Sequence, residues 1–313
     1  MGHERKFRFG VQLGDATSGA EWREKARTIE SLGYSTLYMP DHFIDTQLAP
    51  MVAIAMAAEA TETLRVGTLV LGNDYKHPAV VAKEFATLDV LSGGRVEAGI
   101  GAGWMEVDYT ALGLAYDSPG VRIARLEEAL AVLKGAWGPG PFSLPGEHYS
   151  VTDYDGTPKP VQQPHPPILV GGGGPKLLRL AGREADIVGI NPNLRKGAIT
   201  KDAIHDSVAT MTKQKIEWVR KGAGERFDDL ELQIRYFMCA VTDDRRGLAE
   251  AMAPGFGLSA DDALESGVAC VGTVDEICDL LQTRRDEWGV SYVVVGDEQC
   301  ESFAPVVERL AGT

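Results

Sequence analysis

A histidine beside an aspartate is the first pair of residues in this sequence that could do acid–base chemistry. Asp41 and His42 directly follow the short apolar segment 35–40. Histidine changes charge near neutral pH, and a neighbouring carboxylate can hold its imidazole in one tautomer. The alternative is a loop histidine that caps local backbone groups. An acid or base at this position requires that segment 35–40 be a strand that ends at a ligand.

Small residues followed by an aromatic side chain mark a second candidate position. Gly101, Ala102 and Gly103 precede Trp104. Small side chains allow a flat ligand to approach the backbone closely, and an indole can form one wall of its pocket. The alternative is a tight turn whose Trp104 packs into the core.

Four consecutive glycines form the strongest local signal. The run 171–174 is followed by Pro175 and by the predicted helix 176–183. Backbone N–H groups at a helix N-terminus, free of side chains, favour an anion such as a phosphate. The run is neither a dinucleotide-binding GxGxxG fingerprint nor a P-loop, because a proline takes the fifth place and no GK[ST] follows. We predict a phosphate site here, with a flexible structural turn as the alternative.

Metal and nucleophile chemistry have little support. The polar and aromatic segment 72–78 suits a loop that faces a ligand, while the alternative for His77 is a position just before a helix that begins at Pro78. The histidines show no HxH or HExxH spacing, and no GxSxG occurs, so we predict no metal site and no acyl transfer. Four cysteines without a CxxC pair are expected to be buried thiols: Cys239, Cys270, Cys278 and Cys300.

The elements that must position these residues alternate between short apolar runs and longer amphipathic segments. The predicted strands are residues 7–13, 35–40, 64–71, 95–101, 168–170, 186–190, 230–241 and 291–295. The predicted helices are residues 20–32, 50–61, 78–91, a helix that begins at 118–119, 176–183 and 273–288. This βα alternation predicts a parallel sheet. Eight strands favour one closed (β/α)8 TIM barrel, an α/β fold, over a doubly wound open sheet, and a barrel of this kind collects its active site at the carboxyl ends of its strands.

One segment breaks the rhythm after the fourth strand. Residues 138–167 are rich in glycine and proline and too long for an ordinary connection. We predict an insertion here, either a functional loop or a small hairpin that covers one end of the sheet. No Gly/Ser linker divides the chain, so we expect residues 1–313 to form a single domain.

Composition limits the function classes. The 313 residues, 44% of them hydrophobic, allow a large core, and a formal charge of −14 disfavours nucleic acid and anionic membranes as partners. The N-terminus carries no apolar stretch typical of a signal peptide, so we expect a cytoplasmic protein.

Three segments resemble the bacterial luciferase-like superfamily: residues 67–78, 93–104 and 166–174. Within it, the chain resembles the compact oxidoreductases that use the deazaflavin coenzyme F420, over residues 9 to about 295. The resemblance implies a (β/α)8 barrel with an insertion, F420 as cofactor, a small-molecule substrate and a homodimer. FMN is the alternative cofactor.

The resemblance also implies roles for individual residues. The catalytic residues would be His42, as the main one, with Asp41 and Trp104, and Asp41 would also contact the deazaflavin ring. Leu69 and Val70 match the place where the family often has a non-proline cis peptide behind the ring. Trp104 stands where sugar-phosphate dehydrogenases of this group carry a catalytic glutamate, which argues against a sugar-phosphate substrate. The remaining cofactor-binding residues would be Gly72, Asn73, Gly101, Ala102, Gly103, Tyr149, Gly171, Gly172, Gly173 and Gly174.

The reaction implied by the resemblance is hydride transfer between F420 and a small organic substrate, with His42 as the protonatable group. One rival in the same fold is an FMN-dependent monooxygenase. The other is a protein that binds a flavin or deazaflavin without catalysis.

Overall fold

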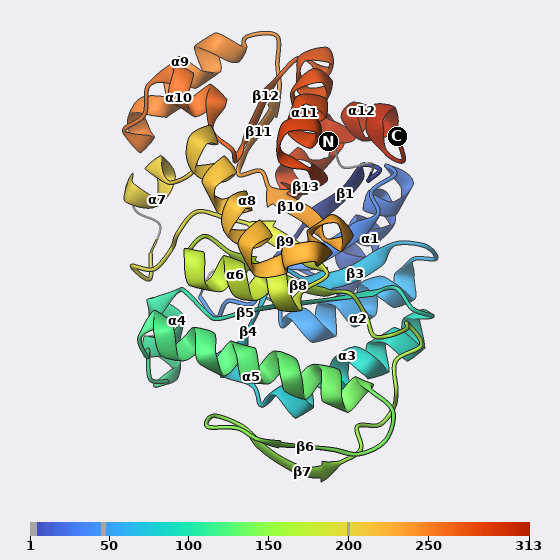
Figure 1. Ribbon diagram of the computed structural model, residues 1–313. Coiled ribbons are helices and arrows are strands. Elements are labelled where there is room, and N and C mark those ends of the chain that lie inside the picture. The colour runs from blue at the N-terminus through green and yellow to red at the C-terminus, as the bar shows by residue number, and fades with distance from the viewer. Residues whose placement is uncertain (1–4, 45–47, 199–200) are drawn as a thin grey trace.

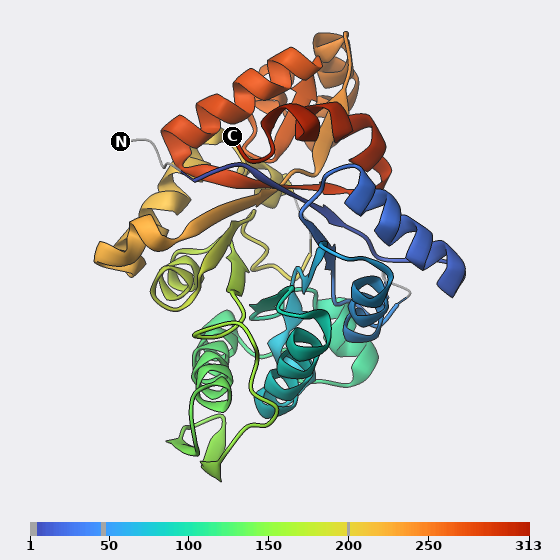
Figure 2. The ribbon, with the colours of Figure 1, turned by 90° about the vertical axis from the view of Figure 1, so that its right-hand side faces the viewer.

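Parallel strands close into a barrel in the part of the chain that the computed structural model describes, residues 5–44, 48–198 and 201–313 (Figures 1 and 2). Pairing between β3 and β5 closes the sheet, and the short β4 extends β3 along β5. The predicted (β/α)8 TIM barrel is therefore confirmed. Its strands are β1 (Arg8–Gln12), β2 (Thr36–Met39), β3 (Arg65–Thr68), β4 (Leu71–Gly72), β5 (Val96–Gly101), β8 (Ile168–Gly172), β9 (Ile187–Ile190), β10 (Glu231–Arg235) and β13 (Val290–Gly296).

Helices surround the barrel, and the six predicted helices are all present among them. The side chain of His77 caps α3 by accepting a hydrogen bond from the Ala79 amide, which is the helix-entry alternative for this histidine. The helices and helical turns that flank the barrel are α1 (Gly19–Ser31), α2 (Pro50–Ala60), η1 (Asn73–Tyr75), α3 (Pro78–Ser92), α4 (Glu106–Leu112), α5 (Pro119–Trp137), α6 (Pro175–Glu184), α7 (Lys201–His205), α8 (Ala209–Ala223), η2 (Gly224–Asp229), α11 (Val274–Trp288) and α12 (Asp297–Leu310).

The predicted strand 230–241 is wrong as a single element. The Tyr236 amide still bonds the Val294 carbonyl of barrel strand β13, but the Phe237 amide bonds the Val268 carbonyl outside the barrel. The chain therefore leaves the barrel between these two residues. It forms an excursion of β11 (Met238–Val241), α9 (Arg245–Phe256), α10 (Ala260–Glu265) and β12 (Ala269–Gly272), in which β11 pairs with β12. All four cysteines are buried free thiols, as expected, and Cys239 faces Cys270 across this pair.

The insertion after the fourth barrel strand contains a hairpin, which is one of the two predicted alternatives. Its strands are β6 (Phe142–Pro145) and β7 (Ser150–Tyr154). Tyr149 and Val151 pack against Ala129 and Val132 of α5 in a small apolar cluster of their own. The hairpin consequently lies on the outer side of α5, away from the sheet (Figure 1), and does not cover an end of it. The last part of the insertion does reach the sheet, because Gln162 bonds Arg65 at the start of β3 and the Val96 carbonyl at the start of β5.

A buried carboxylate occupies the interior of the barrel. Glu97 of β5 is fully buried and accepts hydrogen bonds from Arg8 and Arg65, each at 2.8 Å. The hydroxyls of Tyr38 and Tyr292 donate to its other oxygen. Burial alone would raise the pKa of Glu97, but the two guanidinium groups lower it to about 2. The carboxylate therefore stays ionised and ties four barrel strands to β5.

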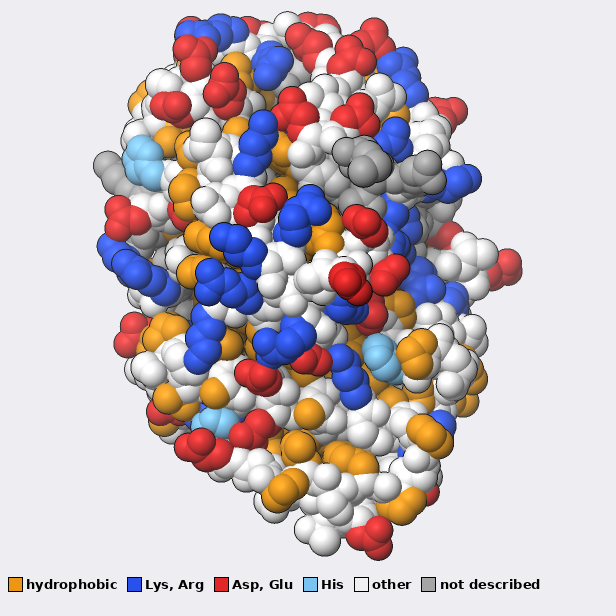
Figure 3. All heavy atoms as spheres, in the orientation of Figure 1, with side chains coloured by type: hydrophobic (Ala, Val, Ile, Leu, Met, Phe, Trp, Pro, Cys, Tyr) orange, Lys and Arg blue, Asp and Glu red, His pale blue; other side chains and the backbone are white. Residues whose placement is uncertain are grey.

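The surface carries its charge unevenly. Figure 3 shows Lys and Arg side chains gathered across the middle of one face, where Figure 1 places α6 and α8. Helix α6 carries Lys176, Arg179 and Arg183. Among the described residues, no helix is long and apolar enough to cross a membrane.

Replacing Glu97 should weaken the barrel in a pH-dependent way. Glu97→Gln removes the charge that compensates two guanidinium groups, so the free energy of unfolding near neutral pH should fall by about 3–5 kcal/mol. Because folding lowers the Glu97 pKa from 4.5 to about 2, its stabilisation is complete above pH 4.5 and is lost as the pH falls toward 2. Denaturant unfolding of both proteins at several pH values measures the difference, which should shrink on acidification. The exposed Glu217→Gln on α8 is the matched control, and a constant difference across pH would contradict the assignment.

Candidate active site

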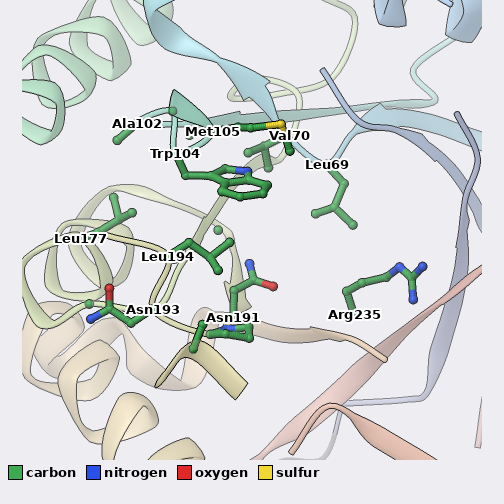
Figure 4. A pocket seen from close by; sticks show the side chains of 18 of the residues that line it. Leu69, Val70, Ala102, Trp104, Met105, Leu177, Asn191, Asn193, Leu194 and Arg235 are labelled. Atoms are coloured by element: carbon green, nitrogen blue, oxygen red, sulfur yellow. The ribbon is translucent and has the colours of Figure 1, made fainter. Parts of the chain in front are cut away.

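A cavity of about 970 Å³ opens at the carboxyl ends of the barrel strands (Figure 4). Its walls come from the loops that follow successive strands, as expected for a barrel of this type. The main contributing segments are residues 12–14, 40–42, 69–72, 101–105, 171–177 and 191–195, together with 235, 237 and 238.

Histidine 42 lies in this cavity and is oriented by a buried carboxylate. Its Nδ1 lies 2.7 Å from Oδ2 of Asp108, and the other carboxylate oxygen accepts a hydrogen bond from the Phe43 amide at 3.0 Å. Asp108 is completely buried in α4. When Nδ1 donates its proton to this carboxylate, Nε2 is the nitrogen that can exchange a proton with a ligand. Nε2 has no hydrogen-bond partner in the described part of the chain.

Asp108 is not among the predicted site residues. The signal was present, because Glu106 and Asp108 come two and four residues after Trp104 and stand in the first turn of a helix. Side-chain contact with residue 42 could not be foreseen, since it joins loops after two different strands. Trp104 itself packs edge-on against the His42 ring, with centroids 5.4 Å apart.

Two further polar side chains stand beside His42. Asp41 accepts a hydrogen bond from the Gly72 amide at 3.0 Å, which ties the loop after β2 to β4. Burial raises the pKa of Asp41, and the Gly72 bond opposes that effect. Burial and the neighbouring carboxylates of Asp108 and Asp41 also raise the pKa of Tyr75, so its phenol stays protonated.

The cis peptide expected between Leu69 and Val70 is present. The Leu69 carbonyl accepts a hydrogen bond from the side chain of Gln12 at 2.9 Å, and both residues rest on the apolar cluster that fills the barrel. A Cβ on Gly101 would lie 2.6 Å from Cγ2 of Val70, so only glycine leaves room for this arrangement. Leu69 and Val70 thus supply apolar side chains to one wall of the cavity.

The glycine run 171–174 forms another part of the wall. A Cβ on Gly173 would lie 2.4 Å from the Pro192 carbonyl group, so this glycine is required by the close approach of the loop after β9. Gly174 caps α6 without any side-chain bond, and the first helical bond runs from the Leu178 amide to its carbonyl. The amides of Lys176 and Leu177 precede that bond and form an N-terminus suited to an anion.

Positive charge predominates around the cavity. Among the described residues that line it, Asp41 is the one acidic side chain, whereas four are cationic: Arg122, Lys176, Arg195 and Arg235. The chain as a whole has a formal charge of −14. The cavity is thus a locally cationic region in an acidic protein, which favours anionic ligands.

Most of the predicted site residues come together in the cavity. Asn73 and Tyr149 do not line it. Instead the Asn73 side chain donates a hydrogen bond to the Tyr149 hydroxyl at 3.1 Å, and Asn73 is buried. Because the hairpin that carries Tyr149 packs outside α5, its predicted contact with a cofactor tail has no support in this arrangement. The residues that line the cavity are Asp41, His42, Leu69, Val70, Gly72, Gly101, Ala102, Gly103, Trp104, Gly171, Gly172, Gly173 and Gly174.

Comparisons with known proteins identify a family. Residues 2–265 match the model of the luciferase-like monooxygenases. An F420-dependent glucose-6-phosphate dehydrogenase of Nakamurella multipartita is 30% identical over 280 residues, which cover 83% of this chain and 77% of that protein. An FMNH2-dependent dimethylsulfone monooxygenase of Pseudomonas putida is 36% identical over 138 residues, 44% of this chain and 38% of that protein. Several other glucose-6-phosphate dehydrogenases match over only about half of their length.

A solved structure supports the fold. The F420-dependent tetrahydromethanopterin reductase of Methanopyrus kandleri superposes with a TM-score of 0.77. It is 19% identical, and the match covers 98% of this chain and 100% of that one.

Removing the carboxylate of Asp108 should loosen the loop that carries His42. Asp108→Ala leaves the Nδ1 group of His42 and the amide of Phe43 without their acceptor, at a cost of about 1–3 kcal/mol in stability. Hydrogen exchange at the Phe43 amide should therefore accelerate by more than tenfold. Glu106→Ala, an exposed change in the same helical turn, is the control. Equal protection in Asp108→Ala and the unmodified protein would rule out this anchoring role.

Proposed function

The chain belongs to the luciferase-like monooxygenase family, and within it we propose an oxidoreductase that transfers a hydride between F420 and a small organic substrate. The observation that carries the proposal is the pair His42–Asp108, which places a fixed imidazole in a cavity that is also lined by the apolar side chains of Leu69 and Val70. The dehydrogenase relative matched over 83% of this chain supports F420 as the cofactor.

The cavity fits a tricyclic ring with a phosphorylated tail. Gly101 leaves space for Val70, whose apolar side chain suits contact with a planar ring. The uncapped N-terminus of α6 and Lys176 suit a phosphate of the tail. F420 supplies hydride transfer at a ring carbon when it is bound.

The residues of this chain would manage the proton and exclude water. His42 would donate or accept a proton through Nε2 at the reacting oxygen or nitrogen of the substrate, while Asp108 holds the ring in that orientation. Trp104 packs edge-on against His42. Its indole would exclude water from this side of the cavity. Because Trp104 cannot donate a proton as a carboxylic acid does, His42 would be the principal acid or base. We therefore expect a substrate other than a sugar phosphate.

An FMN-dependent monooxygenase is the second candidate, and the relative from Pseudomonas putida favours it. The same glycine run could receive the phosphate of FMN. The two candidates differ in chemistry, since a reduced flavin reacts with oxygen and a reduced deazaflavin does not. The homodimer and the cytoplasmic location stay predictions from the resemblance.

Cofactor binding separates the candidates. We expect the purified protein to bind F420 at least tenfold more tightly than FMN, measured by absorbance and fluorescence titration with oxidised and reduced forms. Gly101→Ala should weaken the binding, because its Cβ meets Val70, and Val70→Ala in the same chain should restore part of it. Tight FMN binding with oxygen consumption would overturn the proposal. Binding of neither cofactor would favour a non-catalytic role.

The role of His42 has a kinetic test. Once a reduced or oxidised substrate is found by screening with F420, His42→Ala should lower kcat by about 10²–10⁴-fold, the usual contribution of a general acid or base. The dissociation constant of F420 should change less than about threefold. His148→Ala, in the turn of the β6–β7 hairpin, is the matched control. An unchanged kcat would remove His42 from the mechanism.

A further inference from the structure

An arginine at the end of β10 faces the cavity without a carboxylate partner. Arg235 donates from Nε to the side-chain oxygen of Gln12 at 3.0 Å and from Nη1 to the Tyr236 carbonyl. Both acceptors are neutral. Arg8 and Arg65, by contrast, share the carboxylate of Glu97.

Burial without a counterion is unfavourable for Arg235. The loss of hydration lowers its pKa to about 10, so the guanidinium is still charged near neutral pH. A cation held only by neutral oxygens keeps most of its desolvation cost. An anion that arrives with a ligand would offset this cost.

One amino group of Arg235 is available for such an anion. Nη2 has no hydrogen-bond partner in the described part of the chain. A Cβ on Gly296 would lie 2.8 Å from Nη2, so the glycine at the end of β13 is what makes room for this amino group. Figure 4 shows Arg235 on the opposite side of the cavity from Asn193 and Leu177, which border the glycine end. The anion site at Arg235 is therefore separate from the one at the N-terminus of α6.

The surroundings of Arg235 are apolar. Its guanidinium lies over the ring of Phe237, 5.0 Å from the ring centroid. Beyond Phe237 the cavity wall is supplied by the excursion between β10 and β13, through Met238, Met252, Leu258 and Val268. Methionine and branched aliphatic side chains accept hydrocarbon of varied shape. A cation at the base of an apolar wall is complementary to a molecule with one anionic end and a hydrocarbon body.

We propose that Arg235 binds the carboxylate of an apolar substrate, whose hydrocarbon body lies along the wall formed by the excursion. A single guanidinium with one free amino group matches a planar monoanion better than a phosphate dianion, which needs more donors and charge. The substrate class is thus a carboxylic acid with an aliphatic or aromatic body. This inference rests on the proposed function only in that the ligand is the substrate.

The test compares two probes of equal chain length, octanoate and octan-1-ol. Isothermal titration calorimetry is run on the full chain loaded with F420 and on the chain without cofactor. We expect octanoate to bind at least tenfold more tightly than octan-1-ol. Arg235→Gln should lower octanoate affinity at least tenfold and change octan-1-ol affinity less than twofold. Arg235→Lys keeps the charge and should retain octanoate binding within about fivefold.

Controls make each outcome decisive. Arg23→Gln removes one positive charge on α1, outside the cavity, and should leave both probes unaffected. Equal binding of the two probes, or unchanged octanoate binding in Arg235→Gln, would overturn the inference. So would a loss of F420 affinity in Arg235→Gln as large as the loss for octanoate, because Arg235 would then serve the cofactor. If the chain binds FMN and not F420, the proposed function fails, but the octanoate comparison on the cofactor-free chain still decides the role of Arg235.

Discussion

The ionised carboxylate of Glu97 is the interaction on which the architecture depends. It gathers two guanidinium groups and two phenols from β1, β2, β3 and β13 inside a closed sheet. These contacts fill the amino-terminal half of the barrel with a satisfied polar network. The apolar cluster of Tyr38, Leu169, Ile187, Tyr292 and Val294 spans the interior, and Leu69 and Val70 rest on it. The cavity is consequently confined to the carboxyl ends of the strands, where its apolar wall has a rigid support.

Local patterns predicted most of the fold and much of the site. The alternation of apolar runs and amphipathic segments predicted the barrel, because each strand or helix buries one face and its apolar residues therefore recur with the period of that element. The glycine at 101 and the run 171–174 were likewise local signals, and both lie at the cavity. The change of strand partner at Phe237 could not be predicted, because segment 230–241 contains apolar residues on both sides of that point. Asp108 and Arg235 could not be predicted for another reason. Their importance depends on the groups that they contact, or do not contact, across the barrel.

The cavity has three regions that differ in their chemical character. One side has an uncapped helix N-terminus and Lys176, another has the imidazole held by Asp108, and the third has an unpaired guanidinium beside an apolar wall. Each comes from loops after different strands, so the barrel holds them at fixed separations while the loops vary. The cationic lining explains how an acidic protein can attract anionic ligands: short-range contacts with N–H groups and guanidinium groups outweigh the distant negative charge.

The excursion between β10 and β13 has a consequence for how such a protein diversifies. Its strands β11 and β12 pair with each other and, in the described chain, with no strand of the barrel. Exchanging or lengthening this unit would leave the hydrogen-bonded ring of strands, the cis peptide and the imidazole–carboxylate pair untouched. The part of the cavity wall that this excursion supplies can therefore vary while the strands of the barrel keep their pairing.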